Sequence, residues 1–293
     1  MSRPACVLNI RDIPGEKRPR YTKTPGVAAV VRPLGPATGL TKMGVQLRTV
    51  APGFAGTNRH FHTVEEEWTY VLSGRGTLRI GPLKFAVGPG HFAGYPPGPG
   101  PHHFVNDSDE DLVFLEGGES RPKEDGCWYP DARLMSQGRE IVEPYQEPPP
   151  EACDEAQVLA IDDATIENFQ HDVDSGARRR MRVLHIPTGL ARQAVYWAEV
   201  GAGDRSTAFH THERTDEWVF ILSGTAVADV GDQQFEVGKD DFIGHPAGSP
   251  PHVMQAITDL TYLMGGQIDA SDIVRYPRHE MQRVGRRLEA MTG

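Results

Sequence analysis

The stretch RHFHTVEEEWTYVLSG, Arg59 to Gly74, places two histidines two residues apart and a glutamate five residues after the second. Nearly the same stretch returns as AFHTHERTDEWVFILSG, Ala208 to Gly224. In the second stretch the three residues stand 150 positions later: the two sets are His60, His62 and Glu67, and His210, His212 and Glu217. A repeat of this length is domain-sized, so we expect a duplicated domain.

The repeat extends well beyond the histidines. Residues 44–102 align without a gap with residues 194–252, and after a two-residue deletion DLVFLEGG (111–118) meets DLTYLMGG (259–266). A chain of 293 residues is long enough for two domains that each bury a core.

The segment between the copies, EPYQEPPPEACDEAQ (residues 143–157), is acidic and rich in proline. This composition is typical of a stiff, solvated linker. We therefore predict two domains, residues 1–145 and 146–293.

Each copy reads as a series of short β-strands. WTYVLSGRGTLRI, from Trp68, and WVFILSGTAVADV, from Trp218, are rich in aromatic and β-branched residues, and Gly and Pro interrupt the later runs. This pattern predicts an all-β fold of two barrels or sandwiches, with short helices only at the linker and the C-terminus. The C-terminal helix is predicted from an apolar spacing at Met281, Val284, Leu288 and Met291.

Composition excludes some classes of function. A formal net charge of -10 disfavours nucleic-acid binding, which depends on Lys and Arg at phosphates. No run approaches the roughly 20 apolar residues of a membrane span, and the N-terminus has no signal-peptide pattern. Cys6, Cys127 and Cys153 are scattered, so we interpret them as incidental thiols of a reducing compartment and expect a cytoplasmic protein.

The spacing of the repeated residues suits a metal ion. Side chains alternate along a strand, so His60 and His62 point to the same side, and Glu67 opens the returning strand after a four-residue turn. Glu65 and Glu66, in that turn, are interpreted as carboxylates in water. A further histidine follows a Pro/Gly-rich bend in each copy, in YPPGPGPHHFVN and HPAGSPPHVMQA, and these are His102 and His252.

Three imidazoles and one carboxylate suit Fe, Mn, Ni, Co or Zn better than Ca or Mg, which prefer oxygen ligands. An isolated His-x-His on a strand usually has no metal, but here the full set occurs in both copies. The sequence predicts one divalent transition metal per domain, with coordination positions left for substrate, oxygen or water. The predicted ligands are His60, His62, Glu67 and His102, and His210, His212, Glu217 and His252.

These motifs resemble those of the cupin superfamily, and in particular its two-domain members, the bicupins. The flanking sequence is most similar to that of a group of bacterial cupins. The first cupin motif contains the His-x-His pair, the glutamate and a later glycine, which is Gly74 in the first copy and Gly224 in the second. The second motif is matched by Pro96, Gly98, His102 and Asn106, but the second copy has Ala256 in place of the asparagine. The resemblance implies a small jelly-roll barrel (a double-stranded β-helix) per copy, with the metal in its mouth, and a homodimer.

Members of the superfamily differ in activity, so the fold alone does not name the reaction. We favour a metal-dependent oxidoreductase, a dioxygenase acting on a small organic acid, enol or aromatic compound. Fe or Mn is the preferred ion, with Ni or Zn as alternatives, and Glu67 or Glu217 could act as the base. A metal-dependent isomerase or lyase for sugars or sugar acids is the first alternative, and a non-catalytic small-ligand-binding protein is the second.

The two pockets are expected to differ. Alternation places Thr69 inward in the first copy and Val219 at the same position in the second, so the first pocket is expected to be the more polar. Tyr95 and its counterpart His245 are candidates for the pocket mouth, with a structural role for His245 preferred. Arg48, Arg59 and Arg79 could, with Tyr95, meet an anionic substrate near the mouth of the first pocket, but we interpret them as solvated arginines.

Overall fold

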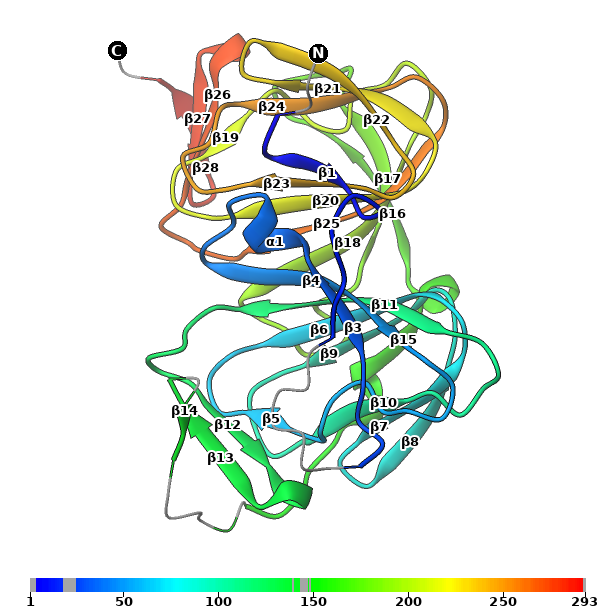
Figure 1. Ribbon diagram of the computed structural model, residues 1–293. Helices are drawn as coiled ribbons and strands as arrows, with labels where there is room; N and C mark the ends of the chain where they lie inside the picture. The colour runs from blue at the N-terminus through cyan, green and yellow to red at the C-terminus, as the bar shows by residue number, and fades with distance from the viewer. Residues whose placement is uncertain (1–3, 18–24, 139, 143–146, 148, 292–293) are drawn as a thin grey trace.

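The computed structural model describes residues 4–17, 25–138, 140–142, 147 and 149–291, and it shows two β-barrels, one above the other in Figure 1. The all-β prediction is confirmed. Each barrel has one seven-stranded sheet, one three-stranded sheet and one four-stranded sheet, and the strands of each sheet pair antiparallel.

The first barrel consists of three sheets. Their strands are, in sheet order, β15 (Val158–Ala160), β9 (His91–Tyr95), β6 (Glu67–Ser73), β11 (Leu112–Glu119), β4 (Met43–Val50), β3 (Val30–Pro33) and β2 (Glu16–Lys17); then β10 (His102–Val105), β7 (Gly76–Ile80) and β8 (Leu83–Val87); then β14 (Glu140–Ile141), β13 (Leu134–Gln137), β12 (Gly126–Tyr129) and β5 (Phe61–His62).

The second barrel repeats this arrangement. Its strands are β1 (Val7–Asn9), β23 (Asp241–His245), β20 (Glu217–Ser223), β25 (Leu260–Gln267), β18 (Gln193–Val200), β17 (Arg178–Val183) and β16 (Ile166–Gln170); then β22 (Gln233–Gly238), β21 (Thr225–Val230) and β24 (His252–Ala256); then β19 (Thr211–His212), β26 (Ile273–Tyr276), β27 (Met281–Val284) and β28 (Arg287–Ala290). The helices are short: α1 (Leu34–Ala37) and the 3₁₀ turns η1 (Pro130–Ala132), η2 (Glu155–Gln157), η3 (Ile161–Asp163) and η4 (Pro277–His279). None of the helices in these described ranges is long and apolar enough to cross a membrane.

The barrels share a hydrophobic core. At its centre Trp68 of β6 stacks on Trp218 of β20, with ring centroids 4.9 Å apart, and both side chains are fully buried. Strands β6 and β20 are buried on both faces because one face fills its own barrel and the other packs against the opposite barrel. This explains why the two strands read as almost continuous apolar runs.

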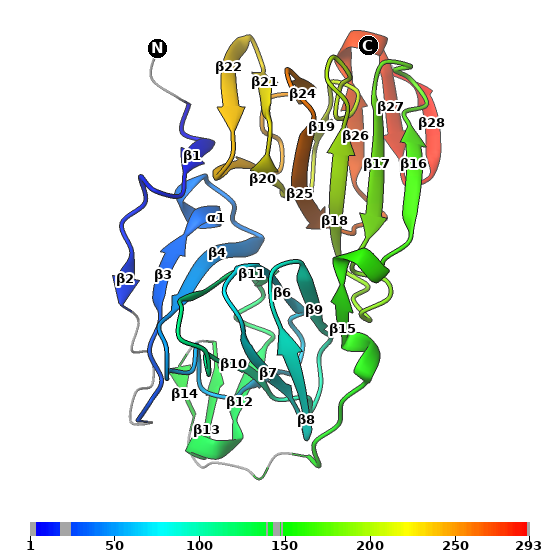
Figure 2. The ribbon, with the colours of Figure 1, turned by 90° about the vertical axis from the view of Figure 1, so that its right-hand side faces the viewer.

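Each barrel also takes an edge strand from a segment distant in sequence. β1, at the N-terminus, pairs with β23 of the second barrel (Figure 1), and β15 pairs with β9 of the first (Figure 2). Such exchanges need long-range pairing that no local pattern encodes. The predicted boundary between residues 145 and 146 lies outside the described residues and stays a prediction.

The carboxylates that precede the predicted glutamate ligands join the barrels. The Glu66 side chain is 2% exposed and accepts hydrogen bonds from the backbone N–H groups of Ala191, Arg192 and Gln193, at 2.9, 2.9 and 3.1 Å. In the same way Asp216, from the second barrel, accepts hydrogen bonds from the backbone N–H groups of Thr41 and Lys42 in the first barrel.

The interpretation of Glu65 and Glu66 as carboxylates in water was therefore wrong. Glu65 is also largely covered, because its carboxylate accepts a hydrogen bond from the backbone N–H of Arg121. The turns before Glu67 and Glu217 both contact segments that are distant in sequence, and the sequence pattern does not predict these contacts.

Replacing Glu66 with alanine is expected to lower the free energy of unfolding by about 2–4 kcal/mol, because three backbone N–H groups at the joint lose their acceptor. Urea unfolding followed by circular dichroism measures the change. Glu110→Ala, at an exposed position of the same barrel, is the control and should stay within about 0.5 kcal/mol of wild type. Equal effects of the two substitutions would contradict the assigned role of Glu66.

The helix predicted across Met281 to Met291 was wrong. Residues Met281–Val284 and Arg287–Ala290 form the hairpin β27–β28, and β27 continues the sheet of β26. Gly285 closes the turn with φ of 57°, a conformation that favours glycine. The available edge of β26 and this glycine outweigh an apolar spacing that was compatible with a helix.

Candidate metal centres

The first cluster is assembled at one end of the first barrel. β5 carries His62, with His60 just before it; Glu67 opens β6 and His102 opens β10. The Nε2 atoms of the three histidines converge on one atom, Glu67 Oε2, at 3.5 Å for His60, 3.4 Å for His62 and 3.2 Å for His102. The structure thus brings together all four residues that the sequence predicts for this copy.

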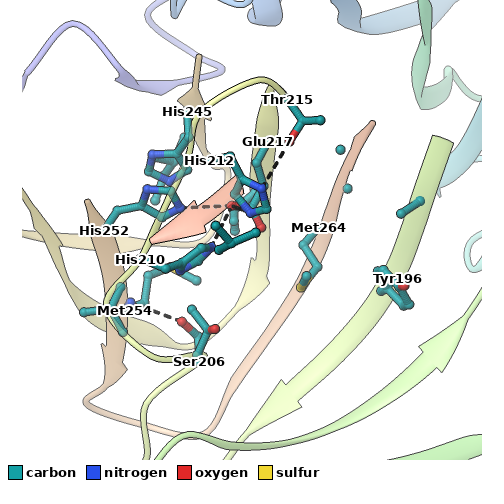
Figure 3. Close-up of a pocket in the computed structure, with 18 of the residues that line it drawn as sticks. Tyr196, Ser206, His210, His212, Thr215, Glu217, His245, His252, Met254 and Met264 are labelled. Carbon is teal, nitrogen blue, oxygen red and sulfur yellow. Dashed lines mark hydrogen bonds and ion pairs between the residues drawn. The ribbon is translucent and has the colours of Figure 1, made fainter. Parts of the chain in front are cut away.

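The second cluster repeats the first. Nε2 of His210, His212 and His252 lies 3.3, 3.8 and 2.9 Å from Glu217 Oε2. Figure 3 shows the three imidazoles turned toward the glutamate, His210 and His212 from the segment at β19 and His252 from β24. All eight predicted residues therefore fall into two matching clusters.

The outer nitrogen of each ring is held by an acceptor. His210 Nδ1 donates to the carbonyl of Ala208 at 2.9 Å, and His212 Nδ1 donates to Asp272 at 2.6 Å. In the first barrel His60 and His62 make the same contacts with Asn58 and Asp125. A proton fixed on Nδ1 leaves the Nε2 lone pair facing the cluster, which is the tautomer that a metal requires.

Protonation in the second cluster fits the same role. Burial opposes the charged form of Glu217, but its close contacts with His210 and His252 outweigh this effect and hold the pKa of Glu217 well below its usual value. Burial, with His210 nearby, lowers the pKa of His252 to about 4. At neutral pH the cluster therefore offers a carboxylate and a neutral imidazole. This donor set, present in both barrels, fits one divalent metal per domain.

The aspartates that orient His62 and His212 were missed by the sequence analysis. Asp125 and Asp272 follow β11 and β25, and both lie in the sequence Asp-x-x-x-Tyr-Pro, at residues 125–130 and 272–277. This shared sequence lies C-terminal to the aligned repeat, which ends at residues 118 and 266, and it is the signal that identifies both aspartates. An acidic group on the outer nitrogen raises the basicity of a ligating imidazole.

Asp272→Asn is expected to weaken metal binding at the second site about 10- to 100-fold, because His212 loses the charge that fixes its orientation and tautomer. Competition with a chromophoric chelator measures the affinity. Asp269→Asn, on the same loop but exposed, is the control and should bind as wild type does. A wild-type affinity in Asp272→Asn would show that the hydrogen bond does not support the site.

Aromatic rings support the last ligand of each cluster. Tyr95 stacks on His102 with ring centroids 3.6 Å apart, and His245 stacks on His252 at 3.4 Å. Both supporting side chains are buried, and burial holds the pKa of His245 well below its usual value, so this ring is neutral. The structure gives these candidate mouth residues a packing role against the ligands.

The two clusters open into different cavities. The second lines a cavity of about 530 Å³, whereas the cavity at the first measures about 220 Å³. In the first, Arg48 forms an ion pair with Glu116 at 2.8 Å, so the interpretation of Arg48 as a solvated arginine was wrong. The corresponding residues of the second barrel are Ala198 and Met264. The ion pair fills space in the first barrel that stays open in the second.

A thiol distinguishes the first cluster. The Cys127 side chain is buried on β12, and its Sγ lies within 4.8 Å of ligand atoms of both His60 and His62, although we interpreted the cysteines as incidental. Its counterpart in the second barrel is Val274. All three cysteines, each in the described part of the chain, are free.

Comparison with known proteins agrees with this geometry. The cupin domain family matches the chain twice, at residues 46–117 and 196–264. The chain belongs to the cupins, and with two such domains it is a bicupin. No curated protein matches it in sequence.

Solved structures show the same fold at low sequence identity. The oxalate decarboxylase of Lactobacillus farciminis, in a formate complex, is similar with a TM-score of 0.61 and 12% identity over 91% of this chain and 87% of that one. The oxalate decarboxylase of Bacillus subtilis gives 0.59 and 17% over 88% and 75%. A salicylate 1,2-dioxygenase variant from Pseudoaminobacter salicylatoxidans gives 0.59 and 13% over 80% and 76%. The TM-scores show a shared fold, and at such low sequence identity they do not determine the reaction.

Proposed function

We propose that this bicupin is a metal-dependent oxidoreductase, a dioxygenase that acts on a small organic acid, enol or aromatic compound, and that the reaction takes place in the second barrel. The observation that carries the proposal is the opening of the His210, His212, Glu217 and His252 cluster into a cavity of about 530 Å³. A volume of this order accommodates a small organic molecule.

The cavity walls are mostly apolar and aromatic. They include Val219, Ile243, Met254, Met264 and Tyr196, and Figure 3 shows Met254 and Met264 near the cluster and Tyr196 farther from it. Such walls exclude water and bind a carbon skeleton, so the polar cluster at one end determines which part of the substrate reacts.

In the proposed site three imidazoles and Glu217 hold the ion, and Fe or Mn is preferred, with Ni or Zn as alternatives. The ion would supply redox chemistry with oxygen together with Lewis acidity. Glu217, held ionised by its histidine neighbours, is the candidate base for a substrate proton. Glu67 has the same chemical position in the first barrel, but the cavity beside it is smaller and contains the Arg48–Glu116 ion pair.

The similar structures support an enzyme without choosing the reaction. They include decarboxylases and a dioxygenase, and their fold is shared with this chain. An isomerase or lyase acting on sugars or sugar acids remains the first alternative from the sequence, although the apolar walls of the larger cavity favour a less polar substrate. A binding protein without catalysis remains the second alternative. The homodimer and the cytoplasmic location stay predictions.

Oxygen consumption tests the proposal. Protein purified without chelator is expected to contain a stoichiometric transition metal. After anaerobic loading with iron or manganese, it should consume oxygen above the blank with at least one member of a panel of small carboxylic acids, enols and phenols. Turnover of sugars or sugar acids without oxygen in zinc-loaded protein would favour the isomerase or lyase alternative. No uptake with any compound under either metal would contradict the dioxygenase.

A further inference from the structure

One cation on the wall of the second cavity has no counter-ion. Arg179, on β17, lines this cavity, and no carboxylate of the described residues forms an ion pair with it. Its neighbours on the strand are both paired: Arg178 lies 2.7 Å from Asp204, and Arg180 lies 3.4 Å from Glu199. The missing partner is therefore particular to the arginine that faces the cavity.

The guanidinium of Arg179 is held in place from two sides. Its Nη1 donates to the backbone carbonyl of Ser206 at 2.6 Å, and its Cζ lies 4.4 Å from the ring centroid of Phe169. Nε is buried and has no hydrogen-bond partner. A buried donor on a charged group needs an acceptor, and a carboxylate matches the guanidinium fork best.

A second polar group lies in the same cavity. The Tyr262 side chain is 1% exposed and lines the cavity, and within the described residues its hydroxyl makes no hydrogen bond of good geometry. Burial raises the pKa of Tyr262, and the nearby Arg179 guanidinium opposes this effect, so the two groups lie close together. The other arginine of the cavity, Arg283, is already neutralised by Asp172 at 2.6 Å. Of the two arginines of this cavity, Arg179 is therefore the one without a carboxylate partner in the described part of the chain, and the Tyr262 hydroxyl lies near it.

The first barrel contains the type of pair that Arg179 lacks. There the cavity arginine, Arg48, is bound by the carboxylate of Glu116 through two nitrogens, at 2.9 and 2.8 Å. Met264 replaces Glu116 in the second barrel, so the protein supplies no carboxylate from that position. The second cavity therefore has an arginine from a different strand, β17, without a carboxylate partner in the described residues, whereas the first has a completed ion pair.

We propose that Arg179 binds the carboxylate of the substrate, so that the second barrel takes organic acids with an apolar or aromatic body. The acid group lies at Arg179, the body lies along the wall that includes Val219 and Met264, and the reacting end faces Glu217. This inference rests on the proposed function, because it assigns the substrate class of that same site. Arg179 is a specificity-determining residue here and takes no part in the chemical step.

Binding of matched acids and amides tests the proposal without depending on turnover. The probes are benzoate, cinnamate and 3-phenylpropionate, each paired with its amide and titrated by calorimetry into manganese-loaded protein at pH 7. At least one acid is expected to bind about 10- to 100-fold more tightly than its amide, as a charge-assisted pair predicts. In Arg179→Gln the affinity of that acid should fall to the level of its amide.

Arg178→Gln is the matched control, because it removes the same charge from the same strand at an exposed position, and it should keep the wild-type preference. Arg179→Lys, expected to retain part of the preference, serves if the glutamine variant does not fold. An acid preference that persists in Arg179→Gln would overturn the proposal, since a carboxylate held by the metal would behave in that way. The absence of any acid preference in wild type would also overturn it.

The proposed dioxygenase activity and the proposed role of Arg179 can be contradicted independently of each other. An acid preference that depends on Arg179 in a protein that consumes no oxygen would keep the assigned substrate class and remove the dioxygenase. Oxygen consumption with an acid preference independent of Arg179 would keep the dioxygenase and remove Arg179 as the anchor.

Discussion

His252→Ala is expected to reduce turnover by on the order of a thousandfold with any substrate that supports oxygen consumption, because the second site loses one of its three imidazoles. His102→Ala, the equivalent change in the first barrel, should keep turnover within about threefold of wild type. The difference is expected because only the second cluster opens into the larger, mostly apolar cavity. Steady-state oxygen uptake measures both variants.

Metal content is the control for this comparison. Each variant should contain about half the metal of fully loaded wild type, because each change damages one of two matching clusters. If both variants lose turnover equally while each keeps one ion, the two sites act together and the assignment of the reaction to the second barrel is wrong. If His102→Ala alone is inactive, the reaction belongs to the first barrel.

The residues that the sequence predicted are those whose positions follow from local geometry. His60 and His62 lie two apart at the start of one short strand and Glu67 opens the next, so strand alternation and a short turn are enough to bring them together. His102 was located by repetition alone, because both copies place a histidine after a Pro/Gly-rich bend. Local pattern and duplication together therefore predicted both clusters and the all-β fold.

The residues that were missed depend on contacts between distant segments. Asp125 reaches His62 from 63 positions away, and Glu66 reaches backbone groups more than 120 positions away. Arg179 lies on β17, outside the part of the repeat that we aligned, and nothing in its sequence context distinguishes it from Arg178 and Arg180. Only the fold shows that one of the three faces the cavity and lacks a counter-ion.

The largest effect on stability is expected at the joint between the barrels. Trp218→Ala should lower the free energy of unfolding by about 3–5 kcal/mol, because it removes a fully buried ring from the core that both barrels share. Phe54→Ala, which removes an aromatic ring that is 41% exposed, is the control and should cost less than about 1 kcal/mol. Urea unfolding followed by circular dichroism measures both.

A double-mutant cycle with Trp68 tests whether the stack itself contributes. Trp68→Ala and Trp218→Ala remove facing rings whose planes lie 15° apart, so the double variant should lose less stability than the sum of the single variants, with a coupling of about 0.5–1.5 kcal/mol. Strict additivity would mean that each ring stabilises only its own barrel. Since Trp68 and Trp218 directly follow the glutamates of the two clusters, a measured coupling would also show that the strands carrying Glu67 and Glu217 are fixed against each other.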